Sequence, residues 1–413
     1  MTVRSPVQLR LDATFTALKY PNYRLWFSGQ IVSLFGTWMQ STAQGFLVYE
    51  LTQSPAFLGY VGFAAGLPSW LFMLYGGVVA DRISRRNLLV ITQSSMMILA
   101  FVLSALTFTG VVQPWHIILL AFLLGVANAF DAPARLALAP ELVAKEDLTN
   151  AIALNGTMFN TAIIIGPTVG SLVYALFGAG WCFFLNGVSF LAVIYALIKM
   201  NLPDMSKGQR RTSSALSDIT EGFRYVLTQP VILALISLIS AVSLFGASFI
   251  TLLPAWAVEV LGGDVKTNGF LNSARGVGAL IGALSIASLG RFRFRGKLLT
   301  IGLFVFPIMM LIFSVISWLP LSLLVLTVVG ASLVFVMNLT NAMIQTHVSD
   351  NVRGRVTSIY SLTFFGFMPI GSLLIGLIAE QASERLALQF GAAMLLLIAA
   401  ATQAIFPNLK AVE

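Results

Sequence analysis

The sequence predicts an all-α polytopic membrane protein with twelve transmembrane helices in two pseudo-symmetric bundles of six. Of the 413 residues, 58% are hydrophobic and only 10% are charged, whereas soluble domains carry about 25% charged residues. The apolar runs reach the length of about 20 residues that a helix needs to cross a hydrocarbon layer. One long polar stretch near the middle of the chain divides these runs six and six.

The boundaries of the elements follow from where the apolar runs stop at charged or turn-forming residues. In chain order, the predicted spans are 24–49, 56–80, 87–110, 115–138, 150–177, 181–200, 230–258, 268–290, 298–318, 320–346, 355–379 and 386–406. The first bundle then takes residues 1–200, a cytoplasmic linker takes 201–229, and the second bundle takes 230–413.

The linker ends in an amphipathic pattern over 217–228. This pattern predicts a short helix on the inner membrane surface, with Phe223 and Tyr225 facing lipid. A simple connecting segment without such a helix is the alternative.

The net charge of +8 reflects membrane topology. With the N-terminus in the cytoplasm, all lysines and arginines except Lys266, Arg275 and Arg385 fall on the cytoplasmic side. This asymmetry follows the positive-inside rule and predicts cytoplasmic N- and C-termini. We therefore expect no nucleic-acid partner. The single cysteine and two distant histidines give no basis for a disulfide or a metal site.

The two halves carry a weak internal repeat. Gly59 and Gly66 in the second span match Gly269 and Gly276 in the eighth at one constant offset. Two repeated bundles are typical of transporters that rock around a substrate site between the halves.

Polar residues form stripes on the spans that the repeat makes equivalent. The first span carries five polar residues at alternating steps of three and four, which places them on one helix face. We expect the stripes to line a substrate cavity, with hydrogen bonds between helices as the alternative. The predicted cavity residues on the first, fourth, seventh and tenth spans are Gln30, Ser33, Thr37, Gln40, Gln44, Asn128, Ser240, Asn338 and Asn341.

The turn between the second and third spans carries a patterned charge cluster. Gly77, Asp81, Arg82, Arg85 and Arg86 follow the order G-x-x-x-D-R-x-x-R-R. The pattern resembles motif A of the major facilitator superfamily. This resemblance implies a six-plus-six transporter fold and a gating role for these residues.

A second resemblance lies in the fifth span. Gly166, Pro167 and Gly170 look like motif C of the exporters in this superfamily, where a Gly-Pro step lets a neighbouring helix approach closely. Segments 22–26, 48–54 and 131–135 resemble the branch of enterobactin exporters and macrolide efflux proteins. The chain departs from drug/proton antiporters in having no arginine over 119–125.

We expect Asp81 to act as a latch that accepts backbone N–H groups at the start of the eleventh span when the cytoplasmic side is closed. Arg85 is expected to hold Asp81, and Asp131 to pair with Arg82 or Arg85 as a charge relay. The alternative is a static salt-bridge cluster that only fixes the turn.

Proton coupling requires a carboxylate that loads and unloads protons, and the predicted carriers are Asp131, Glu50 and Glu259. Arg275 is an intramembrane cation that is expected to pair with Glu259 or to receive an anionic group of the substrate. Snorkelling of Arg275 to the outer surface is the alternative.

These observations predict a monomeric secondary transporter of the bacterial inner membrane. It exports a lipophilic or amphipathic small molecule by alternating access in exchange for protons. A flippase or uniporter of the same fold without proton coupling, and a membrane sensor without transport, are the alternatives. Since no phosphate-binding loop, nucleophile–base pair or metal set occurs, we expect no cofactor, no metal and no enzymatic activity.

Overall fold

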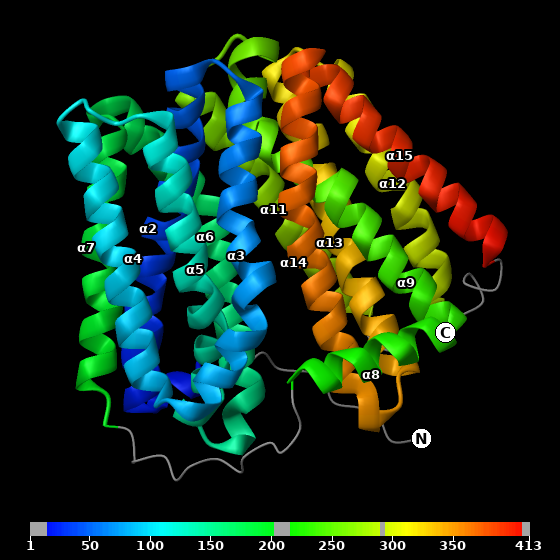
Figure 1. The fold of residues 1–413 in the computed structure, drawn as a ribbon, viewed down its shortest axis with the longest axis horizontal. Helices are drawn as coiled ribbons and strands as arrows, with labels where there is room; N and C mark the ends of the chain where they lie inside the picture. Colours follow the sequence, from blue (N-terminus) through cyan, green and yellow to red (C-terminus); the bar gives the residue numbers. More distant parts are fainter. Residues whose placement is uncertain (1–14, 202–214, 290–293, 407–413) are drawn as a thin grey trace, which may run out of the picture.

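The computed structural model describes residues 15–201, 215–289 and 294–406, which form helices joined by short turns (Figure 1). The first half contains η1 (Thr16–Lys19), α2 (Pro21–Thr52), α3 (Pro55–Arg82), α4 (Arg85–Phe108), α5 (Pro114–Leu138), η2 (Ala139–Leu142), η3 (Lys145–Asp147), α6 (Leu148–Phe177) and α7 (Ala179–Lys199). The second half contains α8 (Ala215–Thr228), α9 (Pro230–Ala241), α11 (Val265–Leu289), α12 (Arg295–Val315), α13 (Leu319–His347), α14 (Asp350–Gln381) and α15 (Glu384–Ile405).

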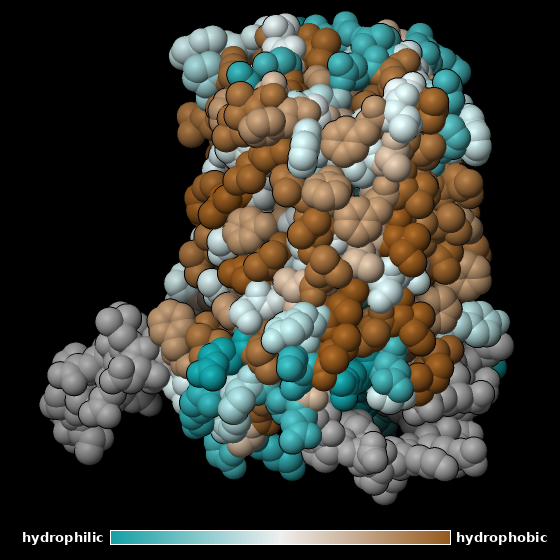
Figure 2. Space-filling view, turned by 90° about the vertical axis from the view of Figure 1, so that its left-hand side faces the viewer, coloured by the Kyte–Doolittle hydropathy of each residue, from teal (hydrophilic) through white to brown (hydrophobic). Residues whose placement is uncertain are grey.

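The helices form two groups in space, α2–α7 on the left of Figure 1 and α9–α15 on the right. One continuous apolar core runs through the second group, around Phe306, Trp256 and Met343. The first group holds several smaller cores, one of them around Tyr49 and Phe183. Apolar residues also cover the outer faces of the helices. Figure 2 shows a broad hydrophobic band across the face turned to the viewer, with hydrophilic residues gathered toward both ends.

Eleven helical segments of the described chain are long and apolar enough to cross a membrane. The first predicted span, α2, is not among them although it contains 32 residues. The glutamines Gln30, Gln40 and Gln44 lower its mean hydropathy, and all three are buried inside the protein. The polar atoms that weaken the sequence signal therefore need not face lipid.

The seventh predicted span is wound irregularly. After α9, a π turn η4 (Val242–Gly246), a 3-10 segment η5 (Ala247–Leu252), the short α10 (Leu253–Ala255) and a second π turn η6 (Trp256–Val260) follow without a break. The apolar run predicts the length of this span but not its changes of winding.

The linker helix α8 confirms the amphipathic prediction and corrects one residue of it. Phe223 is exposed, as expected for a lipid-facing side chain. Tyr225, in contrast, packs against the core of the second group beside the buried Val226. Gly222 explains this position: a Cβ there would lie 2.8 Å from Cδ1 of Ile359, so α8 lies close against α14.

Candidate functional site

The two groups of helices meet along two seams. In the first seam, α3 packs against α14 through glycines. A Cβ added to Gly59 would lie 2.8 Å from the carbonyl oxygen of Ser372, and one added to Gly376 would lie 2.8 Å from the carbonyl oxygen of Pro55. Gly66 lies directly against the ring of Pro369. Small residues therefore allow the two backbones to approach each other closely.

The second seam joins α6 and α11 in the same manner. Gly269 packs against Ser171, and a Cβ on Gly276 would lie 3.0 Å from the carbonyl oxygen of Ile163. The hydroxyls of Thr168 and Ser273 are hydrogen-bonded across this seam at 2.7 Å. The glycines that the internal repeat pairs thus lie at equivalent contacts between the two groups of helices.

These contacts lie toward the end of the molecule that carries the 53–54 and 382–383 turns, the upper end in Figure 1. We call it the sealed end. Polar bonds connect the groups there: Tyr49 Oη donates to Glu259 Oε1 at 2.7 Å, and Ser54 Oγ donates to Glu380 Oε2 at 2.6 Å. A pocket of about 330 Å³ is lined by Tyr49 and by the carboxylates of Glu259, Glu380 and Glu384.

Glu50 and Glu259, two of the predicted proton carriers, have different partners. Glu259 accepts its hydrogen bond from the other group of helices. Glu50 accepts one from Tyr174 of its own group. Both glutamates are exposed. Breaking their hydrogen bonds to Tyr49 and Tyr174 therefore costs little free energy, because water can solvate the carboxylates instead.

The predicted gating turn lies at the other end. The backbone of α3 ends at Arg82 and α4 begins at Arg85, while the side chains of Asp81 and Arg82 lie outside the described residues. Gly77, the predicted motif glycine, has no neighbour within 4 Å of an added Cβ. Its neighbour Gly76 instead packs against the carbonyl of Ala129 in α5.

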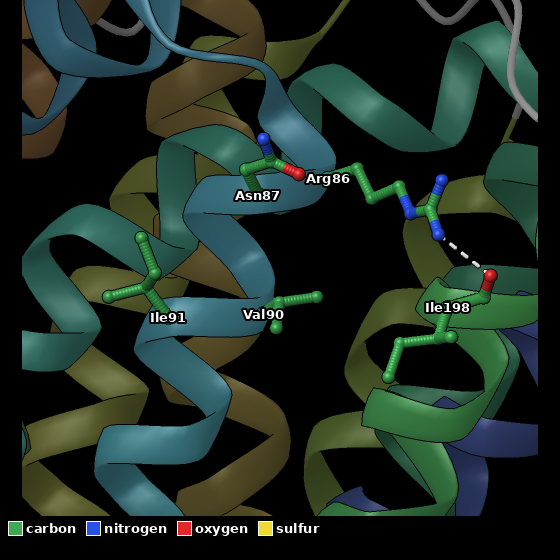
Figure 3. A pocket seen from close by; sticks show the side chains of 5 residues that line it. All are labelled: Arg86, Asn87, Val90, Ile91 and Ile198. Atoms are coloured by element: carbon green, nitrogen blue, oxygen red, sulfur yellow. Dashed lines mark hydrogen bonds between the residues drawn. The ribbon is translucent and has the colours of Figure 1, made fainter.

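The two described arginines of this turn bind different elements. Arg85 forms an ion pair with Glu141 and donates to the carbonyl of Ala137 at 3.3 Å. Arg86 reaches across to the last turn of α7 and donates to the carbonyl of Ile198 at 2.7 Å (Figure 3). Arg86 and Ile198 line a pocket of about 470 Å³ together with Asn87, Val90 and Ile91. The arginines therefore tie α4 to its neighbours within the first group.

Asp131 is buried in α5, and its carboxylate has three polar neighbours that differ from the predicted ones. Its Oδ1 accepts hydrogen bonds from Thr92 Oγ1 at 2.9 Å and Gln93 Nε2 at 2.8 Å. Its Oδ2 lies 3.4 Å from Nε of Arg135, one turn further along the same helix. Of the two expected partners, Arg85 is wrong, because it forms its ion pair with Glu141 of the η2 turn. The side chain of Arg82, the other expected partner, lies outside the described residues.

The polar stripe on α2 is mostly buried. Gln30, Ser33 and Gln44 are buried, and only Thr37 of the five residues is exposed. Gln40 accepts a hydrogen bond from Asn186 of α7 at 2.6 Å. For Gln40 the alternative of a hydrogen bond between helices therefore describes the structure, and the cavity assignment does not.

The remaining predicted cavity residues keep their bonds local. Asn128 and Ser240 donate to the backbone carbonyl four residues earlier in their own helices. Asn338 is exposed, and Asn341 accepts from the glutamine four residues later. Arg275 is partly buried in α11, and its Nε is buried without a hydrogen-bond partner among the described residues.

The motif in the fifth span forms the close contact that was expected. Gly166 and Gly170 lie against α2, where added Cβ atoms would come 2.6 Å from Cβ of Trp38 and 2.8 Å from Cα of Met39. Pro167 is buried, and α6 continues through it. The motif thus fastens α6 to α2 on one side while Thr168 and Ser171 meet α11 on the other.

Several residues of the site were missed from sequence. Thr92 and Gln93 are polar positions inside an apolar span, which is a usable signal for an intramembrane partner. Asn186 carries the same signal in α7. Glu141 lies in the short loop after α5, where a charged residue is ordinary and gives no indication of its partner.

Comparison with known proteins gives consistent matches over nearly the whole chain. A family model described as transmembrane secretion effector matches residues 12–413. The staphyloferrin A transporter of Staphylococcus aureus is 25% identical over 86% of this chain and 89% of its own length. Macrolide efflux protein A of Streptococcus pyogenes is 24% identical over 88% and 91%, and the enterobactin exporter EntS of Shigella boydii is 24% identical over 86% and 85%.

Solved structures share the fold at lower identity. The nucleoside transporter NupG superposes with a TM-score of 0.72 at 16% identity, over 94% of this chain and 99% of its own. A bacterial homolog of the human lysosomal transporter Spinster gives a TM-score of 0.72 at 13% identity, over 94% and 97%.

Proposed function

This chain belongs to the transmembrane secretion effector family of the major facilitator superfamily, and on that premise we propose that it exports a lipophilic or amphipathic small molecule, drug- or siderophore-like, across the bacterial inner membrane. Relatives named for staphyloferrin A, macrolides and enterobactin support this class of cargo. In this proposal α2 also crosses the membrane and brings the number of spans to twelve. Both termini lie in the cytoplasm, and the transporter acts as a monomer.

The observation that carries the proposal is the construction of the sealed end. Its two seams rest on glycine contacts and on a few hydrogen bonds at exposed carboxylates, such as Tyr49 to Glu259. Packing of this kind forms and separates without leaving buried charge behind. We assign the sealed end to the periplasm, so that the cargo enters from the cytoplasm and leaves when the seams open.

The opposite movement requires a device that closes the cytoplasmic end. We propose that Asp81 supplies it by accepting backbone N–H groups at the beginning of α14, where the helix dipole favours a carboxylate. Arg85, held by Glu141, fixes the start of α4 next to it. Replacement Asp81→Asn is expected to abolish efflux while insertion and folding remain normal. Normal efflux by this variant would contradict the latch.

For proton exchange we propose Asp131 as the carrier. It is the buried carboxylate among the three predicted carriers, and its Oδ2 lies 3.4 Å from Nε of Arg135 without a hydrogen bond. Glu50 and Glu259 are exposed at the sealed end. Export without proton coupling is the second possibility, and it is favoured by the absence of an arginine over 119–125.

Transport in proteoliposomes with and without a pH gradient tests this proposal. Cargo flux is expected to rise with the gradient in the wild type, to lose that dependence in Asp131→Asn, and to keep it in Glu50→Gln and Glu259→Gln. Equal wild-type flux with and without the gradient would refute antiport and leave the uncoupled exporter. No flux of any tested drug or siderophore would refute export itself.

A further inference from the structure

Three polar residues share one face of α11. Asn268, Asn272 and Arg275 are spaced by four and three residues, so their side chains leave the helix on the same side. The lipid-facing side of α11 is occupied by four exposed apolar residues at other positions of the helical repeat. They are Phe270, Val277, Ile281 and Leu284.

The neighbours of α11 place the polar face inside the molecule. The face of Gly269 and Gly276 packs against α6, and the face of Gly278 and Gly282 packs against α13. By helical spacing of 100° per residue, the row from Asn268 to Arg275 falls between these two contacts and away from the exposed apolar side. Asn268 is 1% exposed, which confirms its interior position.

The row has more hydrogen-bond donors than acceptors. Asn272 Nδ2 donates to Oδ1 and to the backbone oxygen of Asn268, each at 3.1 Å. Asn268 Nδ2 and Arg275 Nε are buried and have no acceptor among the described residues. No carboxylate of the described chain lies within ion-pair distance of Arg275; Glu259, to which the sequence assigned it, binds Tyr49 instead.

Buried donors without acceptors cost free energy unless a ligand supplies the missing acceptor. Arg275 is the tenth residue after the start of α11, about 15 Å along the helix and near the middle of a hydrocarbon layer of about 30 Å. An uncompensated charge at this depth costs several kcal/mol. Both unpartnered atoms are donors, so the missing group is an acceptor, and an anion also neutralises the guanidinium.

We propose that Asn268, Asn272 and Arg275 form a binding site for a carboxylate group of the exported molecule. The inference rests on the proposed export function and specifies its cargo as an amphipathic organic acid. The planar guanidinium binds both oxygens of a carboxylate, while Asn268 Nδ2 offers a third donor on the same face, two helical turns closer to the start of α11.

The test uses 2-naphthoate and its uncharged isostere 2-naphthamide as probes, with the full-length protein in detergent. The midpoint of thermal unfolding is followed against probe concentration to obtain apparent Kd values. The wild type is expected to bind the acid at least tenfold more tightly than the amide. Arg275→Gln is expected to remove this preference, Arg275→Lys to keep most of it, and Asn268→Ala to reduce it.

Arg385→Gln is the matched control, because Arg385 is a cation of the same half that donates to Ser317 at the surface. It should leave the preference unchanged. Equal binding of acid and amide by the wild type, or a preference that survives in Arg275→Gln, would overturn the proposal. If Arg275→Gln does not fold, unchanged preference in Asn268→Ala overturns it.

A separate assay tests the proposed export function. Efflux of an uncharged fluorescent dye from cells reports export irrespective of acid binding. If the wild type exports the dye but shows no preference for the acid, only the carboxylate site is contradicted. If it shows neither dye efflux nor this preference, the export function is contradicted as well.

Discussion

Replacement of Gly59 by alanine is expected to weaken the sealed end. The added Cβ would lie 2.8 Å from the carbonyl oxygen of Ser372 and 3.3 Å from Cα of Leu373 and Gly376. All three atoms belong to the backbone of α14, so no flexible side chain can move aside. Overpacking of this kind costs about 1–3 kcal/mol, which lowers the ratio of the sealed to the open conformation about 5- to 150-fold.

The rate of disulfide formation across the seam between α6 and α11 reports the fraction of molecules in the sealed conformation. The hydroxyls of Thr168 and Ser273 are 2.7 Å apart, so a Thr168→Cys/Ser273→Cys pair is placed to form a bond between α6 and α11. The native Cys182 is buried and is replaced by alanine in every variant. The Gly59→Ala variant should form this disulfide more slowly, by up to about 5- to 150-fold.

The matched control is Gly156→Ala, also within a helix, where an added Cβ has no neighbour within 4 Å. Its crosslinking rate should equal that of the parent. The same rate in Gly59→Ala and Gly156→Ala would refute the reasoning, because it would show that α3 and α14 do not need this close approach.

Three further changes follow from the contacts. Tyr49→Phe removes the donor to Glu259 and should slow the same crosslink about fivefold, since a bond to a solvated acceptor contributes about 1 kcal/mol. Gln40→Ala and Asn186→Ala should show a coupling of about 0.6 kcal/mol in a double-mutant cycle of unfolding in detergent. Gly166→Ala should lower the unfolding midpoint, because its Cβ would meet Cβ of Trp38 at 2.6 Å.

Each of these has its own check. The exposed Tyr75 provides a Tyr→Phe control that should leave the crosslink unchanged. Additive effects of the Gln40 and Asn186 changes would show that their hydrogen bond does not contribute to stability. An unfolding midpoint of Gly166→Ala as high as that of Gly156→Ala would show that α2 tolerates a methyl group at this contact.

The sequence predicted the helices and the repeat well because both depend on strong local signals. The apolar run over 87–110 became α4 (Arg85–Phe108), and the one over 115–138 became α5 (Pro114–Leu138). The paired glycines lie at equivalent seams because close packing of two helices demands a small residue wherever it occurs.

The partners of polar groups were harder to predict, because periodicity gives the face of a helix but not its neighbour. The stripe on α2 was correctly placed on one face, yet Gln40 faces α7 and not a central cavity. The sequence assigned Arg85 to Asp81 and Asp131, and only the position of the η2 turn brings Glu141 to it. The sequence analysis singled out Arg275 on α11 but not Asn268 or Asn272, and the unpartnered donors of Asn268 and Arg275 emerge only from packing.

The irregular winding after α9 gives this span a means of changing its length. A π turn holds an additional residue compared with the regular helix. If η4 or η6 rewinds to an α-helix, that residue is released, the span lengthens by about 1.5 Å and the side chains beyond it rotate by about 100°. Glu259 lies within η6, so the same rotation would carry its carboxylate away from Tyr49. Rewinding would thus move one side of the sealed end by a screw motion within a single helix.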